Sequence, residues 1–170
     1  MKTEKLRNLQ APLKQKYKDD PDAALVTLKA SGQIGEGVTC KVETGKSFAE
    51  AGLHPATGGN GLAACSGDML LEALAACAGV TINAVATAMD IDLKEGTVIA
   101  EGDLDFRGTL GVSKEAPVGF KAIRLHFSLK TNESRERLSK LQQLTERYCV
   151  VYQTLQHTPE ITITKSVETD

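Results

Sequence analysis

The sequence contains no tryptophan and few other aromatic residues, with four phenylalanines and three tyrosines among 170 residues. It also lacks a block of basic residues, and its formal net charge is −2. Proteins that bind nucleic acid normally combine a basic surface with aromatic side chains on which bases stack. Both shortages therefore argue against a nucleic-acid partner.

Hydrophobic targeting segments are a second feature that the sequence does not show. Residues 1–9 have no apolar core of the kind found in a secretory signal. No uninterrupted apolar run approaches the roughly 18 residues of a membrane span. We therefore expect a cytoplasmic protein without a membrane partner. A chain of 170 residues with 41% apolar content is long enough for one domain with a real core.

The cysteines and histidines lack the short spacings of a zinc site. No two cysteines stand two to four residues apart, and no two histidines stand three to five apart. These residues are Cys40, Cys65, Cys77, Cys149, His54, His126 and His157. We expect no metal and no bound cofactor. Cytoplasmic thiols start reduced, so any disulfide would be catalytic or transient.

The N-terminal third predicts an arm followed by strands. Residues 1–22 are polar and charged, and we expect an arm with at most one helical turn, leaving 23–170 as a single domain. Segments 24–30 and 38–44 are rich in β-branched residues and have glycines between them, which predicts a hairpin. A third short strand is expected at 46–50.

The middle of the chain predicts a loop and then a central helix. Residues 52–61 have the glycine and proline content of a loop. Ser66 or Asp68 can cap a helix that runs to about Ala88. Because this helix is alanine-rich and apolar on all sides, we expect it to be buried. One small sheet cannot cover such a helix, so an obligate homodimer is expected.

Two further strands are predicted in the second half. Segments 97–106 and 121–129 alternate apolar and polar residues, and 108–119 forms the turn between them.

The C-terminal part predicts two helices and a last strand. Thr131 or Asn132 opens a helix with leucines at three-residue steps, and a short second helix carries Cys149 through Leu155. Residues 161–164 are expected to close the fold as a strand. This order of elements indicates an α+β fold with helices packed on antiparallel sheet.

Two cysteines are candidates for chemistry. Cys77 lies among small apolar residues, and Cys149 ends the later helical stretch. A free cysteine commonly packs as a small hydrophobic residue, and nothing near Cys77 in the sequence lowers its pKa. Each residue alone therefore favours a packing role. If the fold brings them together, the pair can attack a peroxide and then close a disulfide.

The glycine-rich loop holds another candidate. Its histidine, His54, can accept a proton near neutral pH. The alternative is a polar turn in which His54 is merely solvated.

Two segments resemble the signatures of the OsmC/Ohr family, named for osmotically inducible protein C and organic hydroperoxide resistance. The first is Cys65-Ser-Gly-Asp-Met-Leu-Leu-Glu-Ala-Leu-Ala-Ala-Cys77. The second is Cys149-Val-Val-Tyr-Gln-Thr-Leu155, where the family usually has Cys-Pro before an apolar helix. The resemblance covers roughly residues 24–165 and points to a divergent OsmC-like branch.

The resemblance implies a fold and an activity. The fold would be OsmC-like α+β, with antiparallel sheets around a buried central helix in an intertwined homodimer. The activity would be that of a thiol-dependent peroxidase that reduces organic hydroperoxides in oxidative stress defence. Cys77 would be the peroxidatic cysteine and Cys149 the resolving one. An external dithiol, of lipoyl type in the Ohr branch, would reduce the disulfide.

The sequence departs from the family pattern at the residues that activate the thiol. Family peroxidases hold the thiolate with an arginine, but no arginine occurs from residue 8 to 106. By spacing, the family arginine falls next to His54 and the family glutamate next to Asp68. We therefore expect His54 and Asp68 to replace them, with Arg107 and Arg147 as the next candidates. A histidine must be protonated to stabilise a thiolate, so we expect a slower and more pH-sensitive enzyme.

A non-catalytic protein on the same fold is the alternative. It would bind a small apolar or thiol-bearing ligand at the dimer interface, and its cysteines would be packed rather than reactive. Counting free thiols before and after treatment with a hydroperoxide separates the two.

Overall fold

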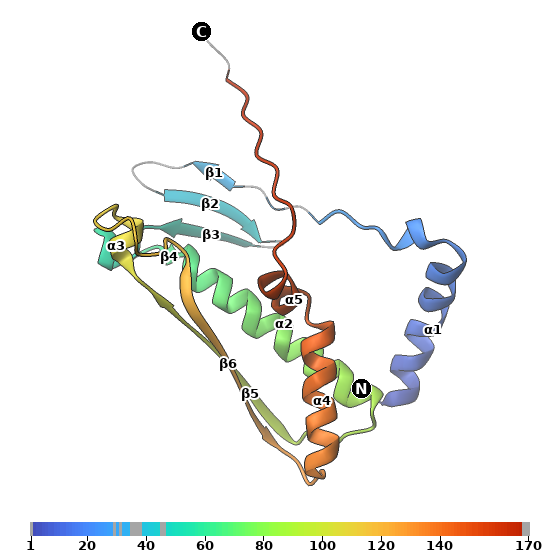
Figure 1. Ribbon diagram of the computed structural model, residues 1–170. Helices are drawn as coiled ribbons and strands as arrows, with labels where there is room; N and C mark the ends of the chain where they lie inside the picture. The colour runs from blue at the N-terminus through green and yellow to red at the C-terminus, as the bar shows by residue number, and fades with distance from the viewer. Residues whose placement is uncertain (1, 29, 31, 35–38, 45–46, 168–170) are drawn as a thin grey trace.

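The computed structural model describes residues 2–28, 30, 32–34, 39–44 and 47–167. A long helix, α2 (Ser66–Ala88), forms the axis of the molecule, and the hairpin of β5 (Glu95–Leu104) and β6 (Phe120–Lys130) runs along it (Figure 1). The architecture is the expected α+β arrangement of helices and largely antiparallel sheet.

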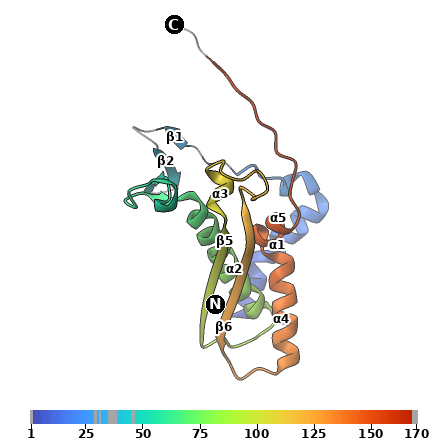
Figure 2. The same ribbon diagram turned by 60° about the vertical axis from the view of Figure 1, so that its left-hand side comes forward.

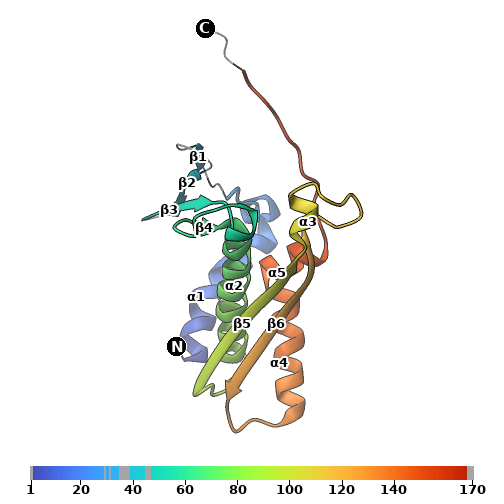
Figure 3. The same ribbon diagram turned by 90° about the vertical axis from the view of Figure 1, so that its left-hand side faces the viewer.

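A four-stranded sheet lies at the N-terminal end of α2 (Figures 1 and 3). Its order is β1 (Gly32–Ile34), β2 (Thr39–Thr44), β3 (Ser47–Gly52) and β4 (Ala64–Cys65). The first three strands are antiparallel, and β4 pairs with β3 in parallel. The strands expected at 38–44 and 46–50 are therefore confirmed in the described residues.

The strand expected at 24–30 is wrong for the single chain. Residues 25–28 have no regular secondary structure, and β2 pairs with β1 instead. A strand needs a neighbour for its backbone groups. Leu25, Val26 and Leu28 are 79%, 71% and 88% exposed, so the apolar content of this segment is left uncovered.

Residues 1–22, expected as an arm that could include one helical turn, contain far more helix than that. Helix α1 spans Thr3–Asp19, and a short 3₁₀ helix, η1 (Pro21–Ala24), follows it. Pro12 and the polar composition made this helix hard to predict, because an interior proline normally disfavours a helix. Leu6, Leu9 and Leu13 nevertheless recur at helical spacing.

Helix α2 begins at Ser66, one residue earlier than a Ser66 cap allows and three residues earlier than an Asp68 cap allows. Cys65 is the N-cap, with extended backbone and no side-chain cap bond, because β4 leads directly into the helix. Ser66 and Asp68 lie inside the first turn. The predicted end at Ala88 is confirmed. By length and composition α2 could cross a membrane, although no apolar run in the sequence was expected to be long enough. Core helices of soluble domains meet the same criteria.

In the described part of the chain, only one side of α2 is buried. The buried residues recur at four-residue steps, and they are Leu74, Ala78, Ile82 and Ala86. Ile82 and Ala86 form a core cluster with Ile91 and Leu141. On the other side Val80 is 72% exposed. The all-round burial expected for this helix is therefore not achieved by a single chain.

The hairpin after α2 follows the prediction closely. Strands β5 and β6 are antiparallel, with a β-bulge at Asp103/Leu104. The predicted turn contains a short helix, α3 (Phe106–Thr109), so β5 ends before Phe106.

Two helices close the described fold, α4 (Arg135–Tyr148) and α5 (Val150–Gln156). Ser134 caps α4 by accepting a hydrogen bond from the Arg137 amide, so the predicted opening at Thr131 or Asn132 is two to three residues early. The predicted strand at 161–164 is wrong. Residues 158–167 have no regular structure and extend away from the body (Figures 1–3).

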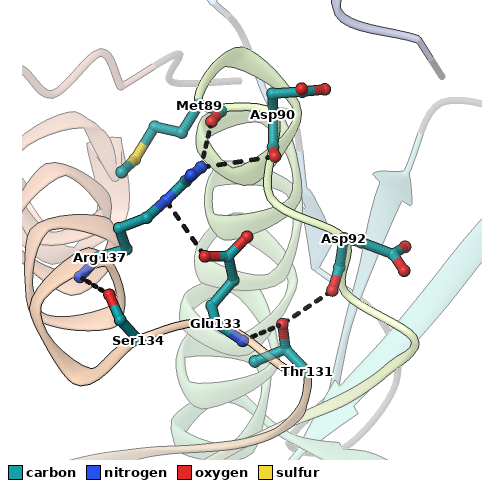
Figure 4. A network of polar contacts seen from close by, with 7 residues as sticks. All are labelled: Met89, Asp90, Asp92, Thr131, Glu133, Ser134 and Arg137. Atoms are coloured by element: carbon teal, nitrogen blue, oxygen red, sulfur yellow. Dashed lines mark hydrogen bonds and ion pairs between the residues drawn. The ribbon is translucent and has the colours of Figure 1, made fainter.

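A polar network fastens the end of α2 to the start of α4 (Figure 4). Arg137 donates to the carbonyls of Met89 and Asp90 at 2.6 and 3.4 Å, and its Nε lies 3.2 Å from Glu133. The Thr131 hydroxyl donates to the Asp92 carbonyl at 2.8 Å. This fastening sets how α4, and hence Cys149, lies against α2.

Candidate functional site

The two candidate cysteines meet between α2 and the junction of α4 and α5. Cys77 is half-buried in the middle of α2. Cys149 is 1% exposed and serves both as the C-cap of α4 and as the N-cap of α5. Each side chain is among the groups that shift the pKa of the other, so the two lie in contact, and both thiols are free.

Opposing effects set the acidity of Cys77. Burial raises the pKa of its thiol, but hydrogen bonds to the sulfur outweigh burial and lower the pKa overall. The groups that lower the pKa are, in decreasing order, the Val151 amide, the Cys149 side chain, the Val150 amide and the Thr81 side chain. Each of these contacts stabilises the anion relative to the neutral thiol, and together they lower the pKa of Cys77.

The pKa of the Cys149 thiol is shifted in the opposite direction. Burial raises its pKa, and the contact with Cys77 raises it further, because a thiol that donates to an anion holds its proton. The amides of Tyr152 and Val151 oppose this effect without reversing it. The two thiols therefore differ in acidity, with the pKa of Cys77 lowered and that of Cys149 raised.

The backbone amides at the start of α5 are the part of the site that sequence reasoning missed. Cys149 ends one helix and begins the next, so the first amides of α5 have no partner within that helix. Val150 stands where the family usually has proline, which has no N–H to donate. The sequence feature that could have revealed these amides is a helix that begins directly after a cysteine.

Thr81 was missed as well. It follows Cys77 by one helical turn, so the two side chains share a face of α2. Its hydroxyl donates to the Cys77 carbonyl at 2.7 Å and also contacts the sulfur.

His54 and Asp68 lie elsewhere in the single chain. His54 caps the 3₁₀ helix η2 (Pro55–Thr57), where its Nδ1 accepts a hydrogen bond from the Ala56 amide at 3.0 Å. Its ring stacks on Phe106, with centroids 4.8 Å apart. Asp68 is exposed in the first turn of α2. Among the described residues of one chain, neither is a group that shifts the Cys77 pKa.

The loop around His54 depends on a close backbone approach. A Cβ at Gly59 would lie 1.7 Å from the Leu53 carbonyl oxygen, so no other residue fits there without movement. The glycine content of the loop thus has a structural cause.

Arg107 and Arg147, the next candidates to activate Cys77, each interact with a residue close to them in the sequence. Arg107 forms an ion pair with Asp105, from Nη2 to Oδ2 at 2.6 Å. The Arg147 guanidinium lies 5.6 Å from the Tyr148 ring centre. Within the described part of one chain, neither arginine contributes to the Cys77 pKa.

The other two cysteines lie apart from the pair. Cys65 is half-buried at the N-cap of α2. Cys40 falls in β2, and its side chain lies outside the described residues. In the described part of the chain no group of three or more potential ligands is placed to hold a metal ion.

Comparison with known proteins gives one family and a consistent fold. The model of a family described as OsmC-like protein matches residues 58–164. The crystal structure of an OsmC-like protein from Mycoplasma pneumoniae has a TM-score of 0.66 and 17% identity, and the match covers 78% of this chain and 89% of that one. Comparison with the curated proteins finds no match.

Two further solved structures are named for hydroperoxide resistance. The organic hydroperoxide resistance protein OsmC from Legionella pneumophila has a TM-score of 0.61 and 21% identity, over 78% of this chain and 91% of that one. The organic hydroperoxide resistance protein OhrB of Bacillus subtilis has a TM-score of 0.54 and 16% identity, over 78% and 93%. At these identities the likeness shows the fold.

Proposed function

The chain belongs to the OsmC-like protein family, and we propose that it is a thiol-dependent peroxidase that reduces organic hydroperoxides. The observation that carries this proposal is the contact between Cys77 and Cys149, in which one pKa is lowered and the other raised. The family and the names of two structural relatives support a peroxide-related redox role.

The first step is attack by the Cys77 thiolate on an oxygen of the hydroperoxide. The O–O bond breaks, and Cys77 takes one oxygen and becomes a sulfenic acid. The other oxygen leaves with the organic group as an alkoxide. It takes the proton that the Cys77 thiol gave up and departs as an alcohol.

The second step closes a disulfide. Cys149 attacks the Cys77 sulfenic sulfur, and its thiol proton leaves with the hydroxyl group as water. A disulfide requires the two Cα atoms to come within about 7 Å. An external dithiol, of lipoyl type in our proposal, then returns two electrons by thiol–disulfide exchange and releases both thiols.

Apolar surroundings favour an organic substrate over hydrogen peroxide. Val80 follows Cys77 by about one turn of α2 and is 72% exposed, and Val150 adjoins Cys149 and is 69% exposed. An organic group that covers these side chains gains apolar burial, which hydrogen peroxide cannot provide.

His54 and Asp68 enter the proposal as residues supplied by a second copy. Their support is their chain position, close to where the family pattern has its arginine and glutamate. Within one chain His54 is bound to its own loop. A protonated His54 from the partner would lower the Cys77 pKa further, and Asp68 would hold it protonated.

The homodimer is part of the same proposal. Within the described part of the chain one side of α2 is buried, and Val80 on the other side is 72% exposed, so a second copy is needed to cover it. A cavity of about 650 Å³ adjoins β6, with Phe120, Ile123 and Leu125 among its lining residues. Leu25, Val26 and Leu28 are exposed and apolar. We propose that this segment adds a strand beside β6 of a second copy. Sedimentation showing a stable monomer at micromolar concentration would contradict the homodimer.

Thiol counting tests the peroxidase. We expect one equivalent of cumene hydroperoxide to remove two free thiols and to leave a Cys77–Cys149 disulfide in the peptide map. A Cys65→Ser variant is the matched control and should lose two thiols as well. Cys149→Ser should stop at the sulfenic acid, which dimedone traps on Cys77. If the wild-type protein loses no thiol, the ligand-binding alternative replaces the enzyme.

We place this activity in the cytoplasm. In the cytoplasm the thiols would start reduced, and a dithiol reductant would be available to reduce the disulfide.

A further inference from the structure

Helix α1 has an apolar stripe that the described part of its own chain leaves uncovered. Leu6, Leu9, Leu13 and Tyr17 recur at spacings of three and four residues and so share one face. Leu9, Leu13 and Tyr17 are 58%, 49% and 39% exposed, and none of the described residues of α1 is buried. Every residue in the second half of the helix, 11–19, is exposed. The stripe can therefore meet a surface outside the chain.

The hydrogen bonds that fasten α1 to the body come from its first turn. The Thr3 hydroxyl lies 2.9 Å from the Thr87 carbonyl and 3.1 Å from Asp90 Oδ1, at the C-terminal end of α2. The rest of α1 runs beside the body in all three views and ends away from that attachment (Figures 1–3). The helix is thus held at one end and presents the remainder of its length to the outside.

Basic residues border the stripe on both sides. At about 3.6 residues per turn, Lys5 and Lys16 lie on one flank, and Arg7 and Lys14 lie on the other. All four are exposed. Residues 1–18 carry six basic residues and one acidic residue, a formal charge of +5. The whole chain has a net charge of −2, so the remaining residues carry −7, and the net positive charge of the protein is concentrated on this helix.

The face opposite the stripe is polar. Glu4, Asn8, Ala11 and Gln15 share it by the same helical spacing. Glu4, the one acidic residue of the first 18, therefore points away from the stripe. The helix is divided into an apolar stripe, two basic borders and a polar back.

This division is typical of a helix that lies in the surface of an anionic membrane. Such a helix inserts its apolar stripe among the headgroups and keeps lysine and arginine at the border, where their charges meet lipid phosphates. A tyrosine such as Tyr17 suits the same boundary, because its ring is apolar and its hydroxyl is polar. Cations on both flanks favour a bilayer over a protein groove. Phosphates surround an inserted stripe on every side, whereas a groove would need acidic residues along both rims.

The acidic residues that follow α1 limit how far the contact extends. Asp19, at the last position of the helix, lies on the polar side of it, and Asp20 and Asp22 lie beyond its end. Anionic lipid would repel all three. The contact is therefore confined to the part of the helix that ends at Lys18, after which the chain turns back toward the body.

We propose that α1 docks on an anionic lipid surface, with Leu9, Leu13 and Tyr17 inserted and the flanking lysines and arginine on lipid phosphates. The inference goes beyond the proposed peroxidase and depends on neither it nor the homodimer. No membrane partner was expected from the sequence because no spanning segment was found, and a helix that lies on a surface needs none. The cytoplasmic leaflet carries anionic lipid, so the docking agrees with a cytoplasmic location.

Cosedimentation with vesicles tests the docking. We expect the full chain to sediment with vesicles of phosphatidylcholine mixed with phosphatidylglycerol, to bind far less to phosphatidylcholine alone, and to be released by added salt. Lys14→Gln with Lys16→Gln should weaken binding to the mixed vesicles about fivefold for each lysine removed. No sedimentation with the mixed vesicles would overturn the docking.

Paired glutamine variants test the stripe without changing the charge. Leu9→Gln with Leu13→Gln removes two apolar side chains from the stripe, and Asn8→Gln with Ala11→Gln places two changes on the polar back. We expect the first pair to weaken vesicle binding at least about tenfold and the second pair to change it little. Equal weakening by both pairs, or by neither, would overturn the insertion of the stripe.

A single tryptophan provides a second readout, because the sequence contains none. Leu13→Trp places the fluorophore in the stripe, and Ala11→Trp places it on the polar back. We expect mixed vesicles to shift the emission of the first variant to shorter wavelength and to leave that of the second unchanged. Unshifted emission from Leu13→Trp would overturn the insertion.

A second copy of the chain is the competing occupant of the stripe. If Leu9→Gln with Leu13→Gln raises the dimer dissociation constant while the wild-type protein ignores the mixed vesicles, the stripe belongs to a protein interface and the lipid docking is wrong. Hydroperoxide-dependent thiol loss, measured without lipid, should be the same for wild type and both glutamine pairs. It therefore reports on the peroxidase separately from the docking.

Discussion

Cys149 contacts Cys77 and is also the N-cap residue of α5, whose first two amides act together with Cys149 to lower the pKa of the Cys77 thiol. One residue therefore supplies one of these groups and positions two more. Within the described chain, this arrangement lowers the pKa of the half-buried Cys77 thiol without help from an arginine. It also keeps the second thiol where a disulfide can form.

The pH dependence of Cys77 alkylation follows from this contact. Because its pKa is lowered, Cys77 should react with iodoacetamide at a half-maximal pH below that of an ordinary thiol. Cys149→Ala removes one donor and should move the midpoint to higher pH. Mass spectrometry of the Cys77 peptide measures the rate, and an unchanged midpoint would remove Cys149 from the activation of Cys77.

Val150→Pro removes one amide donor while keeping a residue suited to the first position of a helix. A single hydrogen bond contributes roughly 0.5–1.5 kcal/mol, so alkylation of Cys77 at pH 7 should slow about two- to tenfold. Val150→Ala keeps the N–H and serves as the matched control. If both variants react at the same rate, the Val150 amide does not stabilise the thiolate.

Thr81→Val tests the side-chain donor on α2. Valine has nearly the shape of threonine but no hydroxyl, so the change removes the contacts to the Cys77 sulfur and carbonyl. We expect a higher Cys77 pKa and slower alkylation at pH 7, with near-equal rates at pH 10. Thr87→Val, on the same helix, should leave both rates unchanged.

His54→Ala tests the residue expected from the sequence. If His54 reaches Cys77 of a second copy, the variant should slow alkylation at pH 7 more than at pH 9, where deprotonation needs less help. Equal rates for variant and wild type at pH 7 would leave Arg107 and Arg147 as candidates and strengthen the case for the α5 amides.

Arg137→Ala tests the fastening of α2 to α4. The change removes the bonds to the Met89 and Asp90 carbonyls and the pair with Glu133. The side chain is half exposed, so we expect a loss of about 1 kcal/mol in the free energy of unfolding. Urea denaturation measures it, with Arg135→Ala as the control on the same helix. No difference between the two variants would show that the network contributes little.

Local patterns in the sequence were enough to predict much of the fold. The apolar run ending at Ala88 and the alternation in β5 and β6 report burial directly, so the central helix and the hairpin could be placed to within a few residues. Where a pattern was weak or interrupted, prediction failed. Pro12 interrupts the helical pattern of α1, so that helix was not predicted. The strand predicted at 161–164 has no neighbour within the described chain to pair with.

The sequence by itself determined that this is an α+β chain with two cysteines in suggestive settings. Only the tertiary structure decided that Cys77 and Cys149 touch, and which of the two thiols is the more acidic. The physical reason is that a thiol pKa depends on burial and on donors within hydrogen-bond reach. The donors from Val150 and Val151 are backbone groups, which every residue but proline carries, so no side-chain pattern could reveal that they point at Cys77.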